Sequence, residues 1–263
     1  MRNISDNKIK ILYIVTQSGF GGAQKNVFDL TVNLDKKKFE AAAAAGPDGG
    51  YELNRLLDEH AIKNFRLKRL RRPISPINDI LALIEIYRLI KREQPNILHL
   101  HSSKTGLLGA IAGRLAGVKV IYTVHGAVFE AAFSWLTRKF FLLLEKISAP
   151  FKNKIICVSE NDRQLWLKYK AAPAKKLTVI HNGINPNIDF AEKESARQKL
   201  FENIPPCPPS KGGIPLFVKE GLGEIFLIGS VGYFYPEKNY TALIEAAALI
   251  KKSPFAKQNK AML

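Results

Sequence analysis

Titratable and hydroxyl-bearing residues follow four apolar runs of this sequence, at the points where β-strands would end. Because ligands bind outside the carboxyl ends of parallel strands, these groups would converge on one rim of a sheet and form a binding or catalytic site there. His99 lies inside its run instead, and for it we expect a structural role. The four motifs are His101-Ser-Ser-Lys104, His125-Gly126, Ser159-Glu160 and His181-Asn-Gly183.

A glycine-rich segment, Ser18-Gly-Phe-Gly-Gly-Ala-Gln24, separates the first apolar run from the first helical pattern. Glycines at such a turn let the backbone approach a phosphate or a sugar, and the N-terminus of the following helix favours negative charge. The segment does not fit the fingerprint of NAD-binding proteins, which needs a glycine where Gln24 stands and an acid where Gly46 stands. The alternative is that these glycines only allow a tight connection between strand and helix.

Strand-like and helical patterns alternate through most of the chain. Segment 39–46 is the weakest expected strand, because its five alanines are poor strand formers, and we expect it from topology alone. Ser75 as N-cap and Pro76 in the first turn predict a helix that ends at Pro95. The alternation predicts an α/β fold with a doubly wound parallel sheet. The expected strands are 9–16, 39–46, 62–67, 96–101, 118–124, 154–159 and 177–181, and the other expected helices are 23–34, 104–116, 133–147 and 161–170.

Composition favours a globular protein with an anionic partner. Of the 263 residues, 46% are hydrophobic and 10% aromatic, and the formal net charge is +17. Such a charge suits phosphate, nucleic acid or an acidic membrane surface without choosing among them. Part of it lies in a basic cluster with no acid between its members: Lys63, Arg66, Lys68, Arg69, Arg71 and Arg72.

The two cysteines, Cys157 and Cys207, have no spacing that indicates a disulfide framework or a metal site, which favours a reducing cytoplasm. The N-terminal apolar run is too short for a signal peptide, and no stretch approaches the roughly 18 apolar residues of a membrane span. We therefore expect a cytoplasmic protein, either soluble or peripheral on the inner face of the membrane.

The sequence predicts a second domain that only begins. Residues 1–184 hold the whole expected sheet, and the polar helical segment 185–202 has the character of a linker. Segment 203–224 is too rich in proline and glycine for a helix or central strand, which indicates a disordered insertion. Residues 225–263 predict the first strand, turn and helix of a second Rossmann-like domain. One wall of an interdomain cleft would then be nearly complete and the other barely begun.

Five segments occur in an order that is specific, although each alone is weak. They are His99-Leu-His-Ser-Ser-Lys-Thr-Gly106, Tyr122-Thr-Val-His-Gly126, Val158-Ser-Glu-Asn161, Val179-Ile-His-Asn-Gly-Ile184 and Gly232-Tyr-Phe-Tyr-Pro-Glu-Lys-Asn239. Together they resemble glycosyltransferase family 4 over residues 9–202 and 225–252. The resemblance implies a GT-B enzyme that transfers a sugar, with retention of configuration, from a nucleotide-diphosphate sugar to a glycan or lipid-linked acceptor in cell-surface polysaccharide synthesis. It implies no cofactor and no bound metal.

The resemblance assigns roles to individual residues. Gly21 and Gly22 form the loop near the donor phosphates and the acceptor, and Lys238 neutralises the leaving diphosphate, where a fixed cation stabilises developing negative charge. His125 contacts the donor sugar and steadies the reacting centre, so it is the expected catalytic residue. The expected acceptor-binding residues are Ser102 and Lys104, and those at the cleft are Glu160, Asn182 and Gly183.

Departures from the family pattern predict impaired transfer. Tyr233 stands where the family usually carries an arginine that binds the diphosphate, and the later pair of glutamates is absent together with its subdomain. We therefore expect this chain to be weakened by loss of most of its donor domain.

The apolar segment 133–147 contains several of the basic residues, and their arrangement can be interpreted in two ways. Its aromatic and aliphatic residues are interspersed with Arg138, Lys139 and Lys146, which suits an interfacial helix at an acidic membrane and equally a core helix with solvated basic edges. Two competing functions follow. One is a non-catalytic module that binds an acceptor or a membrane. The other is a nucleic-acid binder, for which the sequence has no specific recognition motif.

Overall fold

The computed structural model describes residues 8–130 and 134–183, and beyond them only 191–192, 195–196, 242 and 245–246. All described strands form one parallel sheet in the order β3-β2-β1-β4-β5-β6-β7, inside the first of the chain's two units, Met1–Gly183. The strand order reverses between β1 and β4, where open α/β sheets bind ligands. The strands are β1 (Ile9–Val15), β2 (Phe39–Ala45), β3 (Lys63–Arg66), β4 (Ile97–His101), β5 (Lys119–Val124), β6 (Lys154–Cys157) and β7 (Leu177–Val179).

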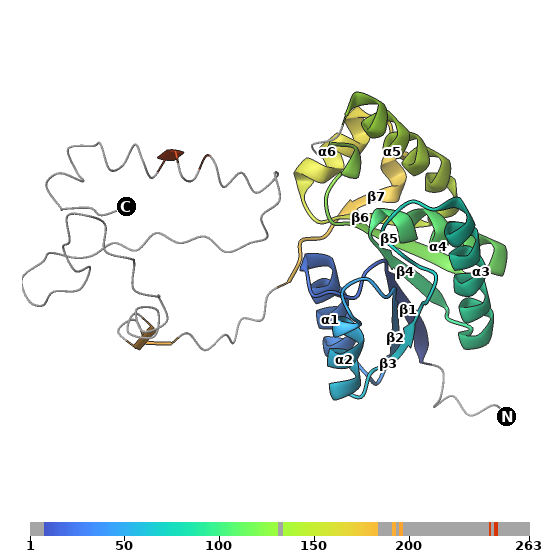
Figure 1. Cartoon of the computed structure of the whole chain (residues 1–263), viewed down its shortest axis with the longest axis vertical. Helices are drawn as coiled ribbons and strands as arrows, with labels where there is room; N and C mark the ends of the chain where they lie inside the picture. The colour runs from blue at the N-terminus through green and yellow to red at the C-terminus, as the bar shows by residue number, and fades with distance from the viewer. Residues whose placement is uncertain are drawn as a thin grey trace, which may run out of the picture. The chain divides into compact units, whose positions relative to one another are not determined.

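Helices cover both faces of the sheet (Figure 1), which confirms the doubly wound α/β prediction. Buried apolar side chains of α1 and α2 join one face, and those of α3 and α4 join the other. The helices are α1 (Gly22–Asn33), α2 (Glu52–Glu59), α3 (Pro76–Glu93), α4 (Ser103–Ala116), α5 (Trp135–Ser148) and α6 (Glu160–Lys168), with short 3-10 turns η1 (Val128–Glu130), η2 (Ala149–Phe151) and η3 (Ala174–Lys176).

The core follows from the alternation of side chains along central strands. In β1, Leu12 and Ile14 point to the face covered by α3 and α4, while Tyr13 and Val15 point to the face covered by α1 and α2. All four are at most 2% exposed. A strand that is buried on both faces has apolar residues at consecutive positions instead of at every second one. This explains the continuous apolar run at residues 11–15 in β1.

The alanine-rich segment is a strand, as expected from topology. β2 pairs in parallel with β1 from Ile9 opposite Phe39 to Val15 opposite Ala45. Residues Ala43 to Ala45 are 1% exposed, because helices enclose them from both sides. Burial between two layers therefore overrides the weak strand propensity of alanine.

Two details of the secondary structure differ from expectation. The helix α2 was not predicted, and it follows a turn in which Tyr51 adopts a left-handed conformation. Ser75 occupies the N-cap position of α3, but its hydroxyl makes no capping bond. The carboxylate of Asp79 accepts the Ser75 N–H instead, and the Ser75 hydroxyl accepts from Asn78.

Among the described residues, no helix has both the length and the apolar character that crossing a membrane would require.

Candidate functional site

The carboxyl ends of β1 and β4 are tied together by hydroxyl groups. The Ser102 Oγ accepts from the Thr16 backbone N–H at 3.1 Å and lies 2.6 Å from Thr16 Oγ1. Ser102 itself has φ 80 and ψ 149, a conformation that non-glycine residues rarely adopt. The turn between β4 and α4 is therefore strained at a residue whose hydroxyl holds the neighbouring strand end.

The glycine-rich loop after β1 rests on the turn that follows β2. Ser18 is fully buried, and its hydroxyl donates to the Asp48 carbonyl while accepting from the Tyr51 N–H. The Phe20 N–H donates to a Glu52 carboxylate oxygen at 3.0 Å. A side chain on Gly49, which has φ 94, would collide with the backbone of Gly19. The loop is thus fixed in place before α1 begins.

Gly22 leaves the start of α1 open, whereas a Cβ on Gly21 would lie 3.1 Å from the Gln24 side chain. Gly21 is the N-cap and provides no side-chain cap, and a Cβ added to Gly22 would meet nothing within 4 Å. Below them, the Gln24 side chain donates to the Gln17 carbonyl at 3.0 Å. The position that a dinucleotide fingerprint reserves for glycine is therefore filled by a side chain that braces the loop.

Aromatic and imidazole rings of three neighbouring strands, β1, β4 and β5, form a row toward the carboxyl ends of these strands. Tyr13 of β1 lies beside His99 and His101 of β4, at ring-centroid distances of 5.2 Å and 6.0 Å. His101 Nδ1 lies 2.9 Å from Nε2 of His125, the residue that directly follows β5. His99 bonds to the Thr123 hydroxyl at 2.8 Å and is 8% exposed, as a structural histidine would be.

Burial keeps these rings uncharged. It lowers the pKa of His99 to about 3 and that of His125 to about 4, and the His125 imidazole adds to the effect on His99. Burial also lowers the pKa of His101 well below its usual value and raises the pKa of the Tyr13 hydroxyl to about 12. Near neutral pH the row therefore presents neutral donors and acceptors.

Lys104 lies in the first turn of α4, but its ammonium is already paired. It donates to Asp79 Oδ1 and to the Pro73 carbonyl, each at 2.6 Å, and its side chain is 12% exposed. The pair ties the start of α4 to the start of α3. A ligand would have to compete with both oxygens for this cation.

The residues expected at the cleft occupy the other end of the rim. Asn182 accepts from the Asn26 amide of α1 at 3.0 Å, and Gly183 is exposed. Glu160 accepts hydrogen bonds from Gln164 and Arg163 of its own helix, and these bonds lower the pKa of its carboxyl group. Its carboxylate therefore belongs to the surface of α6.

The structure brings most predicted residues to one edge of the sheet through three bonds. Thr16–Ser102 links β1 to β4, His101–His125 links β4 to the end of β5, and Asn26–Asn182 links α1 to the chain after β7. Lys238 lies outside the described residues.

Four contributors to the rim were not predicted as site residues: Thr16, Asn26, Glu52 and Asp79. Thr16 could have been noticed because it ends the first expected strand. Its bond to Ser102, however, depends on β1 lying beside β4, which no local sequence pattern reveals.

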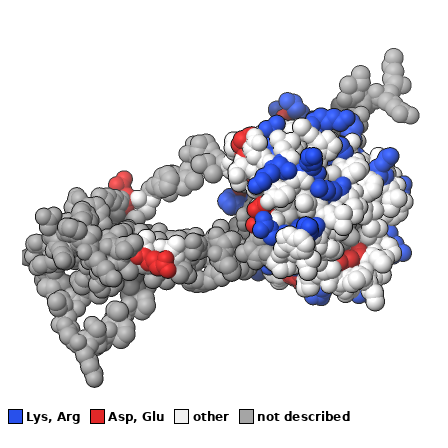
Figure 2. Space-filling model, turned by 90° about the horizontal axis from the view of Figure 1, so that it is seen from above, with Lys and Arg blue, Asp and Glu red and all other residues white. Residues whose placement is uncertain are grey.

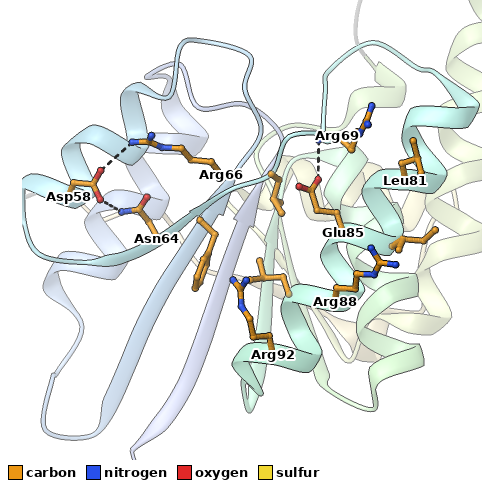
Figure 3. Close-up of a pocket in the computed structure, with 12 residues that line it drawn as sticks. Asp58, Asn64, Arg66, Arg69, Leu81, Glu85, Arg88 and Arg92 are labelled. Carbon is orange, nitrogen blue, oxygen red and sulfur yellow. Dashed lines mark hydrogen bonds and ion pairs between the residues drawn. The ribbon is translucent and has the colours of Figure 1, made fainter.

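A hollow of about 840 Å³ lies elsewhere, between β3 and α3 (Figure 3). Its wall carries part of the basic cluster, yet the guanidinium groups do not converge. Arg66 turns toward Asp58, while Arg69 and Arg88 point in other directions. Both oxygens of the Glu85 carboxylate are taken by backbone N–H groups of residues 68 and 69. The hollow has the volume of a ligand site without a focused set of donors.

Comparison with known proteins identifies the relatives of this chain. A model of Glycosyltransferase Family 4 matches residues 20–188. An Escherichia coli protein, UDP-Gal:alpha-D-GlcNAc-diphosphoundecaprenol alpha-1,3-galactosyltransferase, is 31% identical over 245 residues, which cover 93% of this chain and 58% of that protein. The capsular polysaccharide biosynthesis glycosyltransferase CapM of Staphylococcus aureus is 27% identical over 184 residues, which cover 69% of this chain and 44% of that protein.

Among solved structures, Anabaena HepE in complex with UDP and glucose matches with a TM-score of 0.58 and 21% identity, over 73% of this chain and 50% of that chain. At this identity the match shows the fold alone. The chain spans about half the length of the relatives it matches.

Proposed function

Since the chain belongs to glycosyltransferase family 4, we propose that its first unit is the acceptor-side half of a retaining glycosyltransferase that uses a nucleotide-diphosphate sugar. The acceptor is a lipid-linked glycan of cell-surface polysaccharide synthesis. The observation that carries the proposal is the E. coli relative, whose name states a UDP-Gal donor and a diphosphoundecaprenol-linked acceptor and which matches 93% of this chain.

The rim gives each residue a task in that reaction. The start of α1 at Gly21 and Gly22 offers backbone N–H donors to anionic or hydroxyl-bearing groups. His125 contacts the donor sugar as a neutral hydrogen-bonding group. Ser102 shapes the acceptor side through Thr16, and Lys104 supplies a cation there after exchanging Asp79 for a ligand oxygen. Glu160, Asn182 and Gly183 line the cleft, and Lys238 neutralises the leaving diphosphate.

A membrane surface fits α5. Its outer side exposes a stripe of large apolar side chains at helical spacing, while Phe141 packs inward against the core. Lys139 lies 3.8 Å from the centre of the Trp135 ring, and Lys146 is exposed on the same helix. The stripe consists of Trp135, Leu136, Phe140, Leu143 and Ile147, each between 44% and 70% exposed.

Apolar groups with interspersed cations are the pattern of an interfacial helix at an acidic leaflet. Figure 2 shows Lys and Arg side chains spread over the visible face of the first unit with few acidic ones among them. We therefore place the protein on the inner face of the membrane, where a lipid-linked acceptor resides. One side of α5 packs against the core, as the core-helix interpretation of segment 133–147 expects, and the exposed side is the one that we propose contacts the membrane.

A chimera tests the transfer function. Residues 1–183 of this chain replace the corresponding part of the E. coli galactosyltransferase, and transfer from UDP-galactose to a lipid-diphosphate acceptor is measured. We expect transfer with retention of the anomeric configuration, and a loss on the order of 10²-fold or more when His125→Ala removes a hydrogen-bonding group from the reacting centre. Leu115→Gln, at an exposed apolar position of α4, is the matched control and keeps full activity. A folded chimera without transfer, or one indifferent to His125→Ala, contradicts the proposal.

The second candidate is a binding module without catalysis, which the exposed stripe on α5 favours. Such a module would bind acidic vesicles as tightly as the transferase does. Vesicle binding combined with a folded chimera that transfers no sugar would select this second function.

A further inference from the structure

One fully buried polar atom of the ring row has no hydrogen-bond partner among the described residues. Nε2 of His101 is fully enclosed and forms no hydrogen bond to any residue that the structure describes. The opposite nitrogen, Nδ1, makes the 2.9 Å contact with Nε2 of His125. His101 is thus a completely buried imidazole with one bonded and one orphaned nitrogen.

Both rings of this contact are neutral, so the contact contains one proton. Burial disfavours the imidazolium form of each ring, and only Asp162 of α6 acts against this for His125. The Asp162 carboxylate is itself engaged by the Ser159 hydroxyl at 2.6 Å. In a neutral pair, one nitrogen donates and the other accepts.

The orphaned nitrogen decides which ring donates. If His125 donated, His101 would have to carry its proton on Nε2, where a buried N–H would have no acceptor. Buried N–H groups without an acceptor are rarer in proteins than underused acceptors. If His101 donates from Nδ1, its Nε2 is a bare nitrogen and no donor is buried without a partner.

We infer that His101 is a positioning residue, which donates its Nδ1–H to Nε2 of His125 and so holds His125 as the neutral tautomer with its proton on Nδ1. The inference rests on the proposed function in one respect, the ligand. Nδ1 of the half-buried His125 is not an enclosed atom and has no partner in the described part of the chain. The Nδ1–H of His125 can donate to a sugar oxygen at the carboxyl end of β5. In this tautomer, Nδ1 cannot accept a hydrogen bond from a ligand.

Nuclear magnetic resonance of the wild-type chain tests the tautomer directly. The chain is labelled uniformly with ¹⁵N, and long-range correlations between ring nitrogens and ring carbon-bound protons are recorded at neutral pH. A bare nitrogen and an N–H nitrogen give well-separated signals, and the coupling pattern distinguishes Nδ1 from Nε2. We expect the N–H on Nδ1 and the bare nitrogen on Nε2 for both His101 and His125. The reverse assignment for either ring overturns the inference.

Two variants test whether His101 sets the state of His125. His101→Phe keeps an aromatic ring but removes the donor, so the signals of His125 should change to the average of two exchanging tautomers. His101→Asn places an amide N–H near the position of Nδ1 and should restore the wild-type pattern. An unchanged His125 in a folded His101→Phe protein, or no restoration by asparagine, contradicts the positioning role.

These measurements need no sugar nucleotide and no acceptor. A chimera that fails to transfer sugar while the tautomer pattern is as expected would reject the proposed function and leave the inference standing. A chimera that transfers sugar while the tautomer pattern is the reverse of the expected one would reject the inference alone.

Discussion

Ser102 combines a strained backbone with a hydroxyl that holds a neighbouring strand. Its φ of 80 and ψ of 149 lie near a region that is essentially reserved for glycine and costs on the order of 1–3 kcal/mol for other residues. The hydroxyl offsets part of this cost by accepting the Thr16 N–H. Strain of this kind is usually kept where function requires it, which agrees with the place of Ser102 at the rim.

Two substitutions separate the strain from the bond. Ser102→Ala keeps the strained Cβ and loses the hydroxyl, so we expect a loss of about 1–2 kcal/mol in the free energy of unfolding. Ser102→Gly also loses the hydroxyl but relieves the strain, so it should be more stable than the alanine variant by about 1 kcal/mol. Urea unfolding followed by the fluorescence of buried Trp166 measures both. An alanine variant as stable as the glycine variant would show that the turn is not strained.

The neutral histidines predict a loss of stability in mild acid. In the unfolded chain a histidine binds a proton near pH 6.5, whereas folded His99 has a pKa of about 3. The contribution of a group with a lowered folded pKa is complete above the unfolded value and is lost as the pH falls from about 6.5 toward 3. Each such histidine adds a slope of about 1.4 kcal/mol per pH unit to the free energy of unfolding in that window.

His99→Gln checks this slope, because glutamine can still bond to the Thr123 hydroxyl but does not titrate. We expect the variant to lose less stability than the wild type between pH 6.5 and about 5. Leu115→Gln, at an exposed position of α4 that carries no titratable group, provides the control, with a pH dependence equal to that of the wild type. If the free energy of unfolding of His99→Gln and that of the wild type changed equally with pH, a neutral His99 would be contradicted.

At the scale of elements, α4 lies close to the sheet because glycines face it. A Cβ on Gly109 would come within 2.5 Å of Leu100, and one on Gly106 within 2.7 Å of Tyr122. Gly109→Val should therefore cost about 2 kcal/mol or more through overpacking. Gly22→Ala, where a Cβ meets open space, is the control and should be close to neutral. Thermal unfolding ranks the two variants, and equal stabilities would mean that α4 can move away from the sheet at little cost.

The exposed stripe on α5 predicts vesicle binding that depends on apolar contact. Leu136→Gln combined with Phe140→Gln should weaken binding to vesicles rich in anionic lipid at least tenfold, while leaving stability unchanged because both side chains are exposed. Leu115→Gln is the matched control on another helix. Cosedimentation with anionic and with neutral vesicles measures the effect. Equal vesicle binding by the double variant and the control would contradict a role of α5 in contacting the membrane.

Some elements could be predicted from the sequence and others could not. The long helix α3 carries its own signals, a first-turn proline and apolar residues at helical spacing, and these predicted it. β2 was expected only because an α/β alternation needs a strand there, since its alanines have no strand signal until helices bury them. α2 was missed because its eight residues form a short polar helix whose start depends on a left-handed Tyr51 packed beside Ser18.

At the scale of the whole molecule, the strand order brings motifs that are far apart in the sequence together at one rim of the sheet. The sequence shows which residues end strands, but the Thr16–Ser102 and His101–His125 bonds depend on β1, β4 and β5 being neighbours. The paired state of Lys104 also depends on a tertiary contact, because Asp79 lies on a different helix. The motifs could therefore predict that these residues gather at the carboxyl ends of the strands, but not which bonds their side chains make.

The most direct test of the rim as the acceptor site is hydrogen exchange of the chain with and without a lipid-diphosphate sugar bearing a shortened lipid. The account predicts slower exchange at residues 16–24, 101–106 and 125–126, with no change at 64–69 beside the hollow between β3 and α3. Slower exchange at 64–69 with none at the rim would contradict it.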